Sequence, residues 1–125
     1  MLKLSYCLRR LPHLSREEFQ RYWRETHGPL VAKHREALRI HRYVQVHAEP
    51  AAAQEALRAS RGAPEEYDGV AELWWRSEAD LAAALATEAG RRAAQALLED
   101  ERRFIDLARS PLWLGREHEV LAAAD

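Results

Sequence analysis

Histidine is the side chain best suited to exchanging protons near neutral pH, and this chain has six histidines. His27 is the most informative of them. It follows Phe19 by eight residues and Trp23 by four, so it belongs to the inward face of a predicted helix. Two roles fit this position. His27 could hydrogen-bond the backbone at a helix end, or it could act as a general acid or base on a bound substrate.

A second group of polar side chains follows one face of a predicted strand. This face carries Tyr43, Gln45 and His47, and we expect Glu72 and Trp74 to share it from the next strand. If a partner subunit closes the face, these side chains line a cavity, where each polar group needs a partner or a ligand. A carboxylate buried beside an indole would then suit acid or base chemistry. If the face meets water, the same alternation is ordinary amphipathicity.

Other kinds of site have less support. His118 lies on a predicted last strand and faces either a substrate or water. His27, His34 and His41 are spaced seven apart, but His41 falls on a predicted strand, so helical spacing does not gather them around a metal ion. The single cysteine, Cys7, can build neither a thiolate metal site nor an internal disulfide.

Size and charge narrow the class of protein. The chain has 125 residues, which predicts a single domain over residues 1–125. Its 19 Lys and Arg against 20 Asp and Glu give a net charge of −1, unlike the basic surface of a nucleic-acid-binding protein. No signal peptide is visible, and the apolar stretches fall short of the roughly 20 residues that a membrane span needs. We therefore expect a cytoplasmic protein without nucleic-acid or membrane partners.

Alternating apolar and polar residues predict four strands, over residues 2–9, 40–47, 69–76 and 112–121. After the first strand, Ser15 and Glu18 form a capping box that starts a helix. The segment His27-Gly28-Pro29 is expected to interrupt this helix, with a second segment from Pro29 to about Leu38.

The later connections are also expected to be helical. Residues 48–68 form a long connection whose middle, 51–61, is rich in helix formers that Gly62 could cap. This segment could be a lid, a dimer clasp or a long loop. Ser77 starts another helix, which Gly90 is expected to end or kink before a last stretch over 91–108.

The order of these elements is β-α-β-β-α-β, which predicts an α+β, ferredoxin-like fold with extra helices. Such a fold has one four-stranded antiparallel sheet with both main helices on one face. We expect Tyr43 and Trp74 on the other, uncovered face. Exposing apolar surface costs about 25 cal/mol per Å². A second copy is therefore expected to cover this face, which makes the protein a homodimer.

Four stretches resemble the EthD family. The most specific is Phe19-x-x-Tyr22-Trp23-x-x-x-His27-Gly28-Pro29-Leu30. The opening residues 2–19, the stretch 67–74 and the segment Asp100-Glu101-x-x-Phe104-Ile105-Asp106 are similar to the same family, in the same order. The resemblance implies a dimeric α+β barrel, in agreement with the order of the elements.

The resemblance also implies a range of activities. EthD proteins are associated with oxidoreductase systems, and relatives act as decarboxylases or cyclases. The wider superfamily includes cofactor-free monooxygenases, isomerases, haem peroxidases and stress-responsive barrels. Only the motif residues carry over to this chain, namely Tyr22, Trp23, His27, Gly28 and Pro29. Likeness of fold does not by itself establish a reaction.

The first hypothesis is a small-molecule enzyme, or an accessory component of an oxidative degradation or biosynthetic system. Its substrate would be a small apolar ring or carbonyl compound in a barrel cavity. His27 would transfer a proton with help from His47, Glu72 or His118. The substrate would contact Tyr22, Trp23, Tyr43, Gln45, Trp74 and His118. No bound organic cofactor or metal is implied.

The second hypothesis is a non-catalytic barrel that binds a hydrophobic metabolite or takes part in a stress response. It predicts the same cavity without a proton-transfer group beside the ligand. A third hypothesis is a haem-binding barrel with a histidine axial ligand. The position of His27 relative to the cavity separates the first hypothesis from the second.

Overall fold

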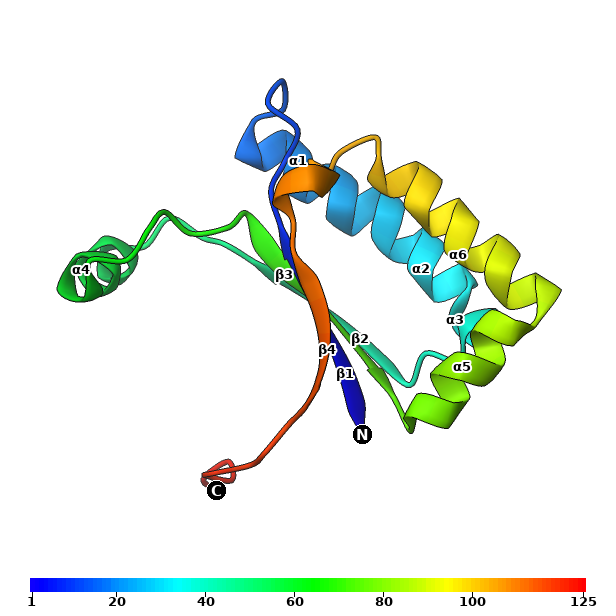
Figure 1. The fold of residues 1–125 in the computed structure, drawn as a ribbon. Helices are drawn as coiled ribbons and strands as arrows, with labels where there is room; N and C mark the ends of the chain where they lie inside the picture. The colour runs from blue at the N-terminus through cyan, green and yellow to red at the C-terminus, as the bar shows by residue number, and fades with distance from the viewer.

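A four-stranded antiparallel sheet, covered on one face by helices, forms the centre of the computed structural model, which describes all of residues 1–125 (Figure 1). The strands are β1 (Leu2–Leu8), β2 (Arg42–His47), β3 (Gly69–Trp75) and β4 (Leu112–Arg116). Their order across the sheet is β2-β3-β1-β4. This is the ferredoxin-like arrangement that the sequence predicted.

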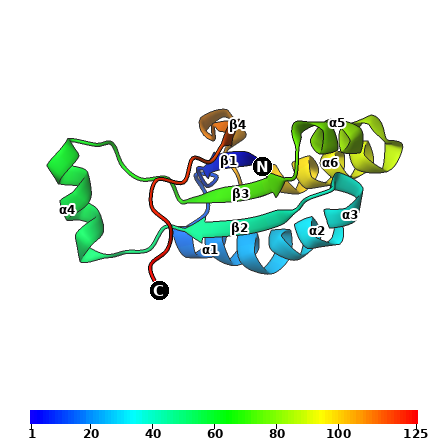
Figure 2. The ribbon, with the colours of Figure 1, turned by 90° about the horizontal axis from the view of Figure 1, so that it is seen from below.

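Five α-helices lie on one side of the sheet (Figure 1). They are α1 (Arg16–Tyr22), α2 (Gly28–Lys33), α3 (Arg35–Leu38), α5 (Glu78–Ala86) and α6 (Glu88–Glu101). A π-helix, η1 (Trp23–His27), joins α1 to α2, and a short 3₁₀ helix, η2 (Leu107–Arg109), precedes β4. The remaining helix, α4 (Ala52–Arg61), stands apart from the other helices (Figure 2). None of the helices is both long and apolar enough to cross a lipid bilayer.

The first helical segment begins as predicted but does not break where predicted. Ser15 Oγ accepts a hydrogen bond from the Glu18 N–H at 3.1 Å, and the Glu18 carboxylate accepts one from the Ser15 N–H at 3.0 Å. The expected interruption at His27-Gly28-Pro29 is wrong. The chain continues through the wider π turn, in which the Gly28 N–H bonds the Trp23 carbonyl. Pro29 then lies in the first turn of α2, where a missing N–H is tolerated.

Two other predicted boundaries are wrong. The break between α5 and α6 comes at Thr87, not at Gly90, because Thr87 caps α6 by accepting a hydrogen bond from the Gly90 N–H at 2.9 Å. Gly90 lies in the first turn of α6, where a Cβ would come within 1.8 Å of the Ala84 carbonyl oxygen. The last strand ends at Arg116, so the exposed His118 lies beyond the sheet.

The register of the strands corrects the predicted faces. Tyr43 pairs with Leu73, whereas Trp74 pairs with Arg42, so Tyr43 and Trp74 lie on opposite faces. Tyr43 faces the helices together with Gln45 and the core residues of β1 and β3. The expectation that Tyr43 and Trp74 share the uncovered face is therefore wrong. A period-two pattern separates two sets of residues, but it does not show which set meets the helices.

The face of the sheet that these five helices leave uncovered, here called the open face, carries both charged and apolar side chains. Lys3 pairs with Glu72 at 2.5 Å, and Lys3 and Arg42 lie over the Trp74 ring. The Trp74 indole N–H donates to Glu117, which completes the burial of this ring. Beside this charged part, Val46 and Trp113 remain 48% and 53% exposed.

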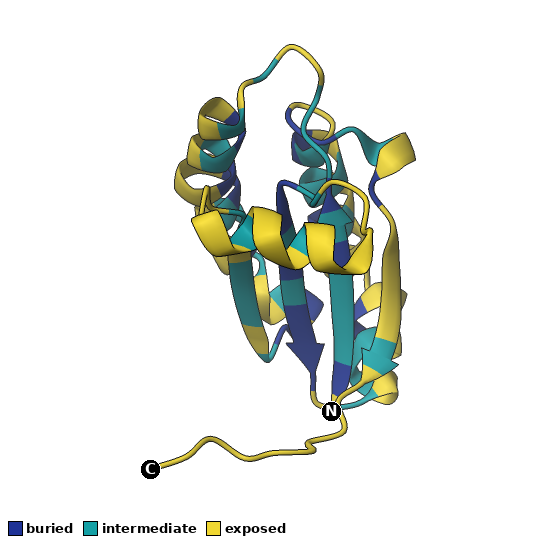
Figure 3. Ribbon diagram, turned by 90° about the vertical axis from the view of Figure 1, so that its left-hand side faces the viewer, coloured by how far each residue is buried: buried dark blue, intermediate teal, exposed yellow.

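Helix α4 confirms the prediction of a helix in the long connection. It ends at Gly62, whose φ of 58° is left-handed as expected for a glycine cap. No residue of α4 is buried, and Leu57 is exposed. The helix stands in front of the open face of the sheet, on the side opposite the other helices (Figures 1 and 3).

Candidate active site

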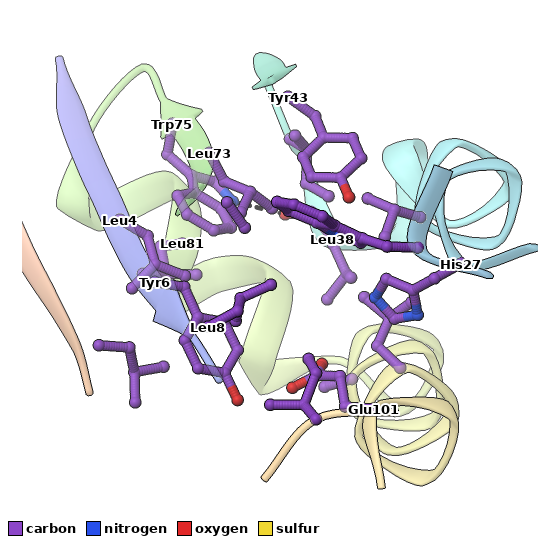
Figure 4. Close-up of a pocket in the computed structure, with 18 of the residues that line it drawn as sticks. Leu4, Tyr6, Leu8, His27, Leu38, Tyr43, Leu73, Trp75, Leu81 and Glu101 are labelled. Carbon is purple, nitrogen blue, oxygen red and sulfur yellow. Dashed lines mark hydrogen bonds between the residues drawn. The ribbon is translucent and has the colours of Figure 1, made fainter. Parts of the chain in front are cut away.

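A cavity of about 360 Å³ lies between the sheet and the helices (Figure 4). Nearly all of the residues that line it are aliphatic or aromatic, and they come from all four strands and from η1, α2, α3, α5 and α6. His27 and Glu101 are the exceptions. Tyr6 and Tyr43 add hydroxyl groups. An apolar cavity with a few placed polar groups is the usual form of a small-molecule site.

The residues that line the cavity differ in how far they are buried. Leu85 on α5 and Leu112 on β4 are 44% and 54% exposed. His27 is buried, as are Trp23 and Val31 beside it. His27 therefore lies on a buried part of the cavity wall.

His27 is held by a buried carboxylate. Its Nδ1 lies 2.7 Å from Asp100 Oδ2, and the Tyr22 hydroxyl donates to Asp100 Oδ1 at 2.5 Å. An ionised carboxylate can only accept, so Nδ1 carries the hydrogen of this bond. The other ring nitrogen, Nε2, then keeps its lone pair in the neutral imidazole. Since no protein group bonds Nε2, the ring presents a free base on the lining of the cavity.

The environment keeps this imidazole neutral at neutral pH. Burial lowers the pKa of His27 below its usual range, although Asp100 partly opposes the shift. Burial and the Asp100 carboxylate also raise the pKa of Tyr22. Tyr22 therefore stays protonated and continues to donate to Asp100. The arrangement Tyr22–Asp100–His27 orients a base in the way that a buried aspartate orients a catalytic histidine in hydrolases.

Glu101 follows Asp100 and reaches the cavity directly. Burial raises its pKa to about 7, the charge of Asp100 adds to this effect, and the Tyr6 hydroxyl opposes it. The pKa of Tyr6 is in turn raised by burial and by Glu101. Near neutral pH the Glu101 carboxyl is therefore protonated in a large fraction of molecules.

Tyr43 is positioned by a row of hydrogen bonds behind the cavity. Gln45 Nε2 donates to the Trp23 carbonyl at 2.9 Å and to the Tyr43 hydroxyl oxygen at 2.7 Å. The carbonyl oxygen of Gln45 accepts from His47 Nε2 at 2.7 Å, and the His47 ring stacks on Trp23. Because the Tyr43 oxygen accepts from Gln45, its own O–H remains free to donate into the cavity. Gly28 leaves room for this amide, since a Cβ there would lie 3.2 Å from Gln45 Nε2.

The structure brings together part of the predicted site. Trp23, His27 and Tyr43 line the cavity. Tyr22 lies behind His27 through Asp100, and Gln45 and His47 lie behind Tyr43.

Three predicted residues lie elsewhere. Glu72 is on the open face and pairs with Lys3. Trp74 is on that face as well, and His118 is exposed after the last strand. The expectation that Glu72 and Trp74 share a cavity with Tyr43 is wrong, because the cavity lies on the helical side of the sheet.

Tyr6, Asp100 and Glu101 were not among the site residues predicted from the sequence. The sequence does contain a pattern that indicates the two carboxylates. Ala93, Leu97 and Phe104 recur at helical spacing and form an apolar stripe, and Asp100 and Glu101 lie within this stripe. Acids within such a stripe face the interior. No group of three or more histidine, cysteine, aspartate or glutamate side chains is placed to hold a metal ion.

Comparison with known proteins agrees with this architecture. A family model described as the EthD domain matches residues 11–108. No curated protein matches the chain. An EthD family protein from Bacillus halodurans is 16% identical with a TM-score of 0.60, and the match covers 94% of this chain and 100% of that one. An EthD-like protein from Ralstonia eutropha is 15% identical with a TM-score of 0.58, and the match covers 91% of this chain and 88% of that one.

A similar structure with a described activity is SnoaB from Streptomyces nogalater, a cofactor-independent oxygenase. It is 16% identical, with a TM-score of 0.52, and the match covers 97% of this chain and 98% of that one. At such identities the likeness shows a shared fold and leaves the reaction to be argued from the site.

Proposed function

The chain belongs to the EthD domain family, and we propose that it is a small-molecule enzyme that transfers a proton on a small apolar ring or carbonyl compound. One observation carries this proposal. The free Nε2 of His27 lies on a buried part of the wall of an apolar cavity, while Nδ1 is fixed by the buried Asp100. In this tautomer the lone pair of Nε2 lies on the wall of the cavity, where a bound ligand can meet it.

The cavity supports a simple mechanism. Its apolar lining binds the substrate, and the Tyr43 hydroxyl donates a hydrogen bond to a carbonyl oxygen. His27 then removes a proton from a carbon next to that carbonyl, and the hydrogen bond stabilises the negative charge that develops on oxygen. In this proposal no bound organic cofactor takes part.

The biological setting we propose is an oxidative degradation or biosynthetic system. Support comes from the fold, which this chain shares with the cofactor-independent oxygenase SnoaB. If the reaction consumes O₂, the substrate itself must be easily oxidised once it is deprotonated. We also propose that residues 1–125 act as one EthD-like domain in the cytoplasm, without nucleic-acid or membrane partners.

Exchange of a carbon-bound hydrogen tests the proposal without knowledge of the natural substrate. The probe is 2-tetralone, an apolar bicyclic ketone with an activated C–H beside its carbonyl. In D₂O, the wild-type protein should accelerate the loss of the C1 proton signal in NMR spectra. Quenching of tryptophan fluorescence reports binding, because Trp23 and Trp75 line the cavity.

A pair of substitutions on α6 places this activity in the cavity. Ala94→Phe fills space that the ligand would occupy, and it should weaken binding of the ketone about tenfold or more, with a parallel loss of exchange. Ala89→Phe adds the same ring at an exposed position of the same helix and should change neither. Binding of the ketone without accelerated exchange would instead support the non-catalytic barrel.

We further propose that two copies associate through the open faces of their sheets. Val46 and Trp113 are about half exposed on this face, and α4 stands in front of it, where a second copy would contact its exposed Leu57. Apolar surface of this kind is typical of an interface. Light scattering should therefore give twice the chain mass of 14.4 kDa.

A charge on this face should separate the copies. Val46→Arg places a guanidinium within the proposed interface, so we expect the mass to fall to that of one chain at micromolar concentration. Ala82→Arg adds the same side chain to the exposed side of α5 and should leave the dimer intact. A wild-type protein that scatters as a monomer would contradict the proposed dimer.

A further inference from the structure

Glu101 lines the same cavity as His27, and the mechanism above leaves it unused. Adjacent residues on a helix point about 100° apart. Asp100 therefore turns toward His27 and Tyr22, while Glu101 turns toward Tyr6 and the cavity. Figure 4 shows the His27 ring and the Glu101 carboxyl at the same end of the cavity, from two different helices.

We infer that Glu101 is a second catalytic group, a general acid that delivers a proton to the substrate from which His27 removes one. The inference rests on the proposed function and adds a residue and a substrate class to it. One small ligand can touch both groups, because both line a single cavity and lie at the same end of it (Figure 4).

The surroundings of Glu101 favour its protonated form. The titratable groups that face it are Tyr6 from β1, Tyr43 from β2, His27 from η1 and Asp100 on its own helix. None of these is a permanent cation, and no lysine or arginine lines the cavity. Burial then raises the pKa of Glu101 to about 7, which suits an acid that works near neutral pH.

The step requires only proton transfer. His27 Nε2 takes a proton from the carbon next to the carbonyl, and the electron pair of the broken C–H bond forms a C=C bond. The carbonyl π pair moves to oxygen, which takes the proton of Glu101 as the carboxyl O–H bond breaks. The product is the enol of the same ketone, and nothing is oxidised or reduced. Solvent then removes the proton from the imidazolium and returns one to the Glu101 carboxylate.

The charged and ionisable groups of the cavity also define the substrate class. An anionic ligand would find no counter-charge in this cavity and would raise the cost of any ionised Glu101. The substrate that fits is therefore a neutral, mostly apolar, enolisable ketone. Its carbonyl oxygen would lie toward Glu101 and Tyr43, and its acidic C–H toward His27.

The pH dependence of 2-tetralone exchange tests this inference. Catalysis needs neutral His27 and protonated Glu101. As the pH is increased, the wild-type rate should first rise, at pH values below 6.5, because His27 loses its proton. It should fall again above about pH 7, because Glu101 loses its own proton. Glu101→Gln should lower the maximal rate at least tenfold and abolish the alkaline fall. Glu99→Gln makes the same change at an exposed position of α6 and should leave the profile unchanged.

A second variant covers the case in which Glu101→Gln fails to fold. Tyr6→Phe removes the hydroxyl that lowers the pKa of Glu101, so the alkaline limb should move to higher pH. An unmoved limb in Tyr6→Phe, or an unchanged rate and limb in folded Glu101→Gln, would overturn the role of Glu101 and leave that of His27 standing. Absence of wild-type exchange with the ketone bound would overturn the proposed function itself.

Discussion

Replacing His27 by alanine is expected to lower the rate of 2-tetralone exchange by about 10²–10⁴-fold, the usual contribution of a general base. The dissociation constant of the ketone should change little. Most of the binding comes from the apolar residues that line the cavity, and His27 is only one of the lining residues. Exchange at saturating ketone, with fluorescence titration of binding, separates these two quantities.

The matched control for this variant is His13→Ala, which removes an exposed imidazole before α1. It should exchange the ketone at the wild-type rate. Equal rates for the wild type and a folded His27→Ala variant would show that His27 is a structural residue. A loss of binding and rate in the same proportion would show that the imidazole only shapes the cavity.

The order of the elements could be predicted from the sequence because local patterns encode it. The alternation in residues 2–9 and the Ser15–Glu18 capping box concern residues close together in the chain. The π-helix at Trp23–His27 could not be predicted in this way. It depends on tertiary contacts, among them the hydrogen bond from Gln45 to the Trp23 carbonyl across 22 residues of sequence.

The site was predictable only in part for the same reason. His27 stood out by its residue type and by its place on an inward helical face. Its partner Asp100 is 73 residues away, and only the packing of α6 against η1 brings the two together. The polar row on β2 is unusual in the sequence, but the prediction that it lies on the uncovered side of the sheet is wrong. The contact that shows the orientation of this row is the hydrogen bond from Gln45 to the backbone of η1. Alternation along a strand cannot reveal such a contact.

Asp100→Asn is expected to reduce the exchange rate by about 10²–10⁴-fold without weakening binding of the ketone. The carboxylate can only accept from His27 Nδ1, which places the lone pair on Nε2. An asparagine can instead turn its NH₂ group toward Nδ1 while its carbonyl oxygen accepts from Tyr22. The imidazole would then carry its hydrogen on Nε2, and the cavity would lose its base.

The pH profile distinguishes this effect from a loss of packing. The Asp100 charge raises the pKa of both His27 and Glu101, so its removal should move both limbs of the profile to lower pH. A repacked but otherwise intact site would lower the rate and keep both limbs in place. Glu99→Gln, which removes an exposed carboxylate one residue earlier, should show neither change. A wild-type rate in folded Asp100→Asn would mean that His27 keeps its reactive tautomer without the carboxylate, and the orienting role of Asp100 would have to be abandoned.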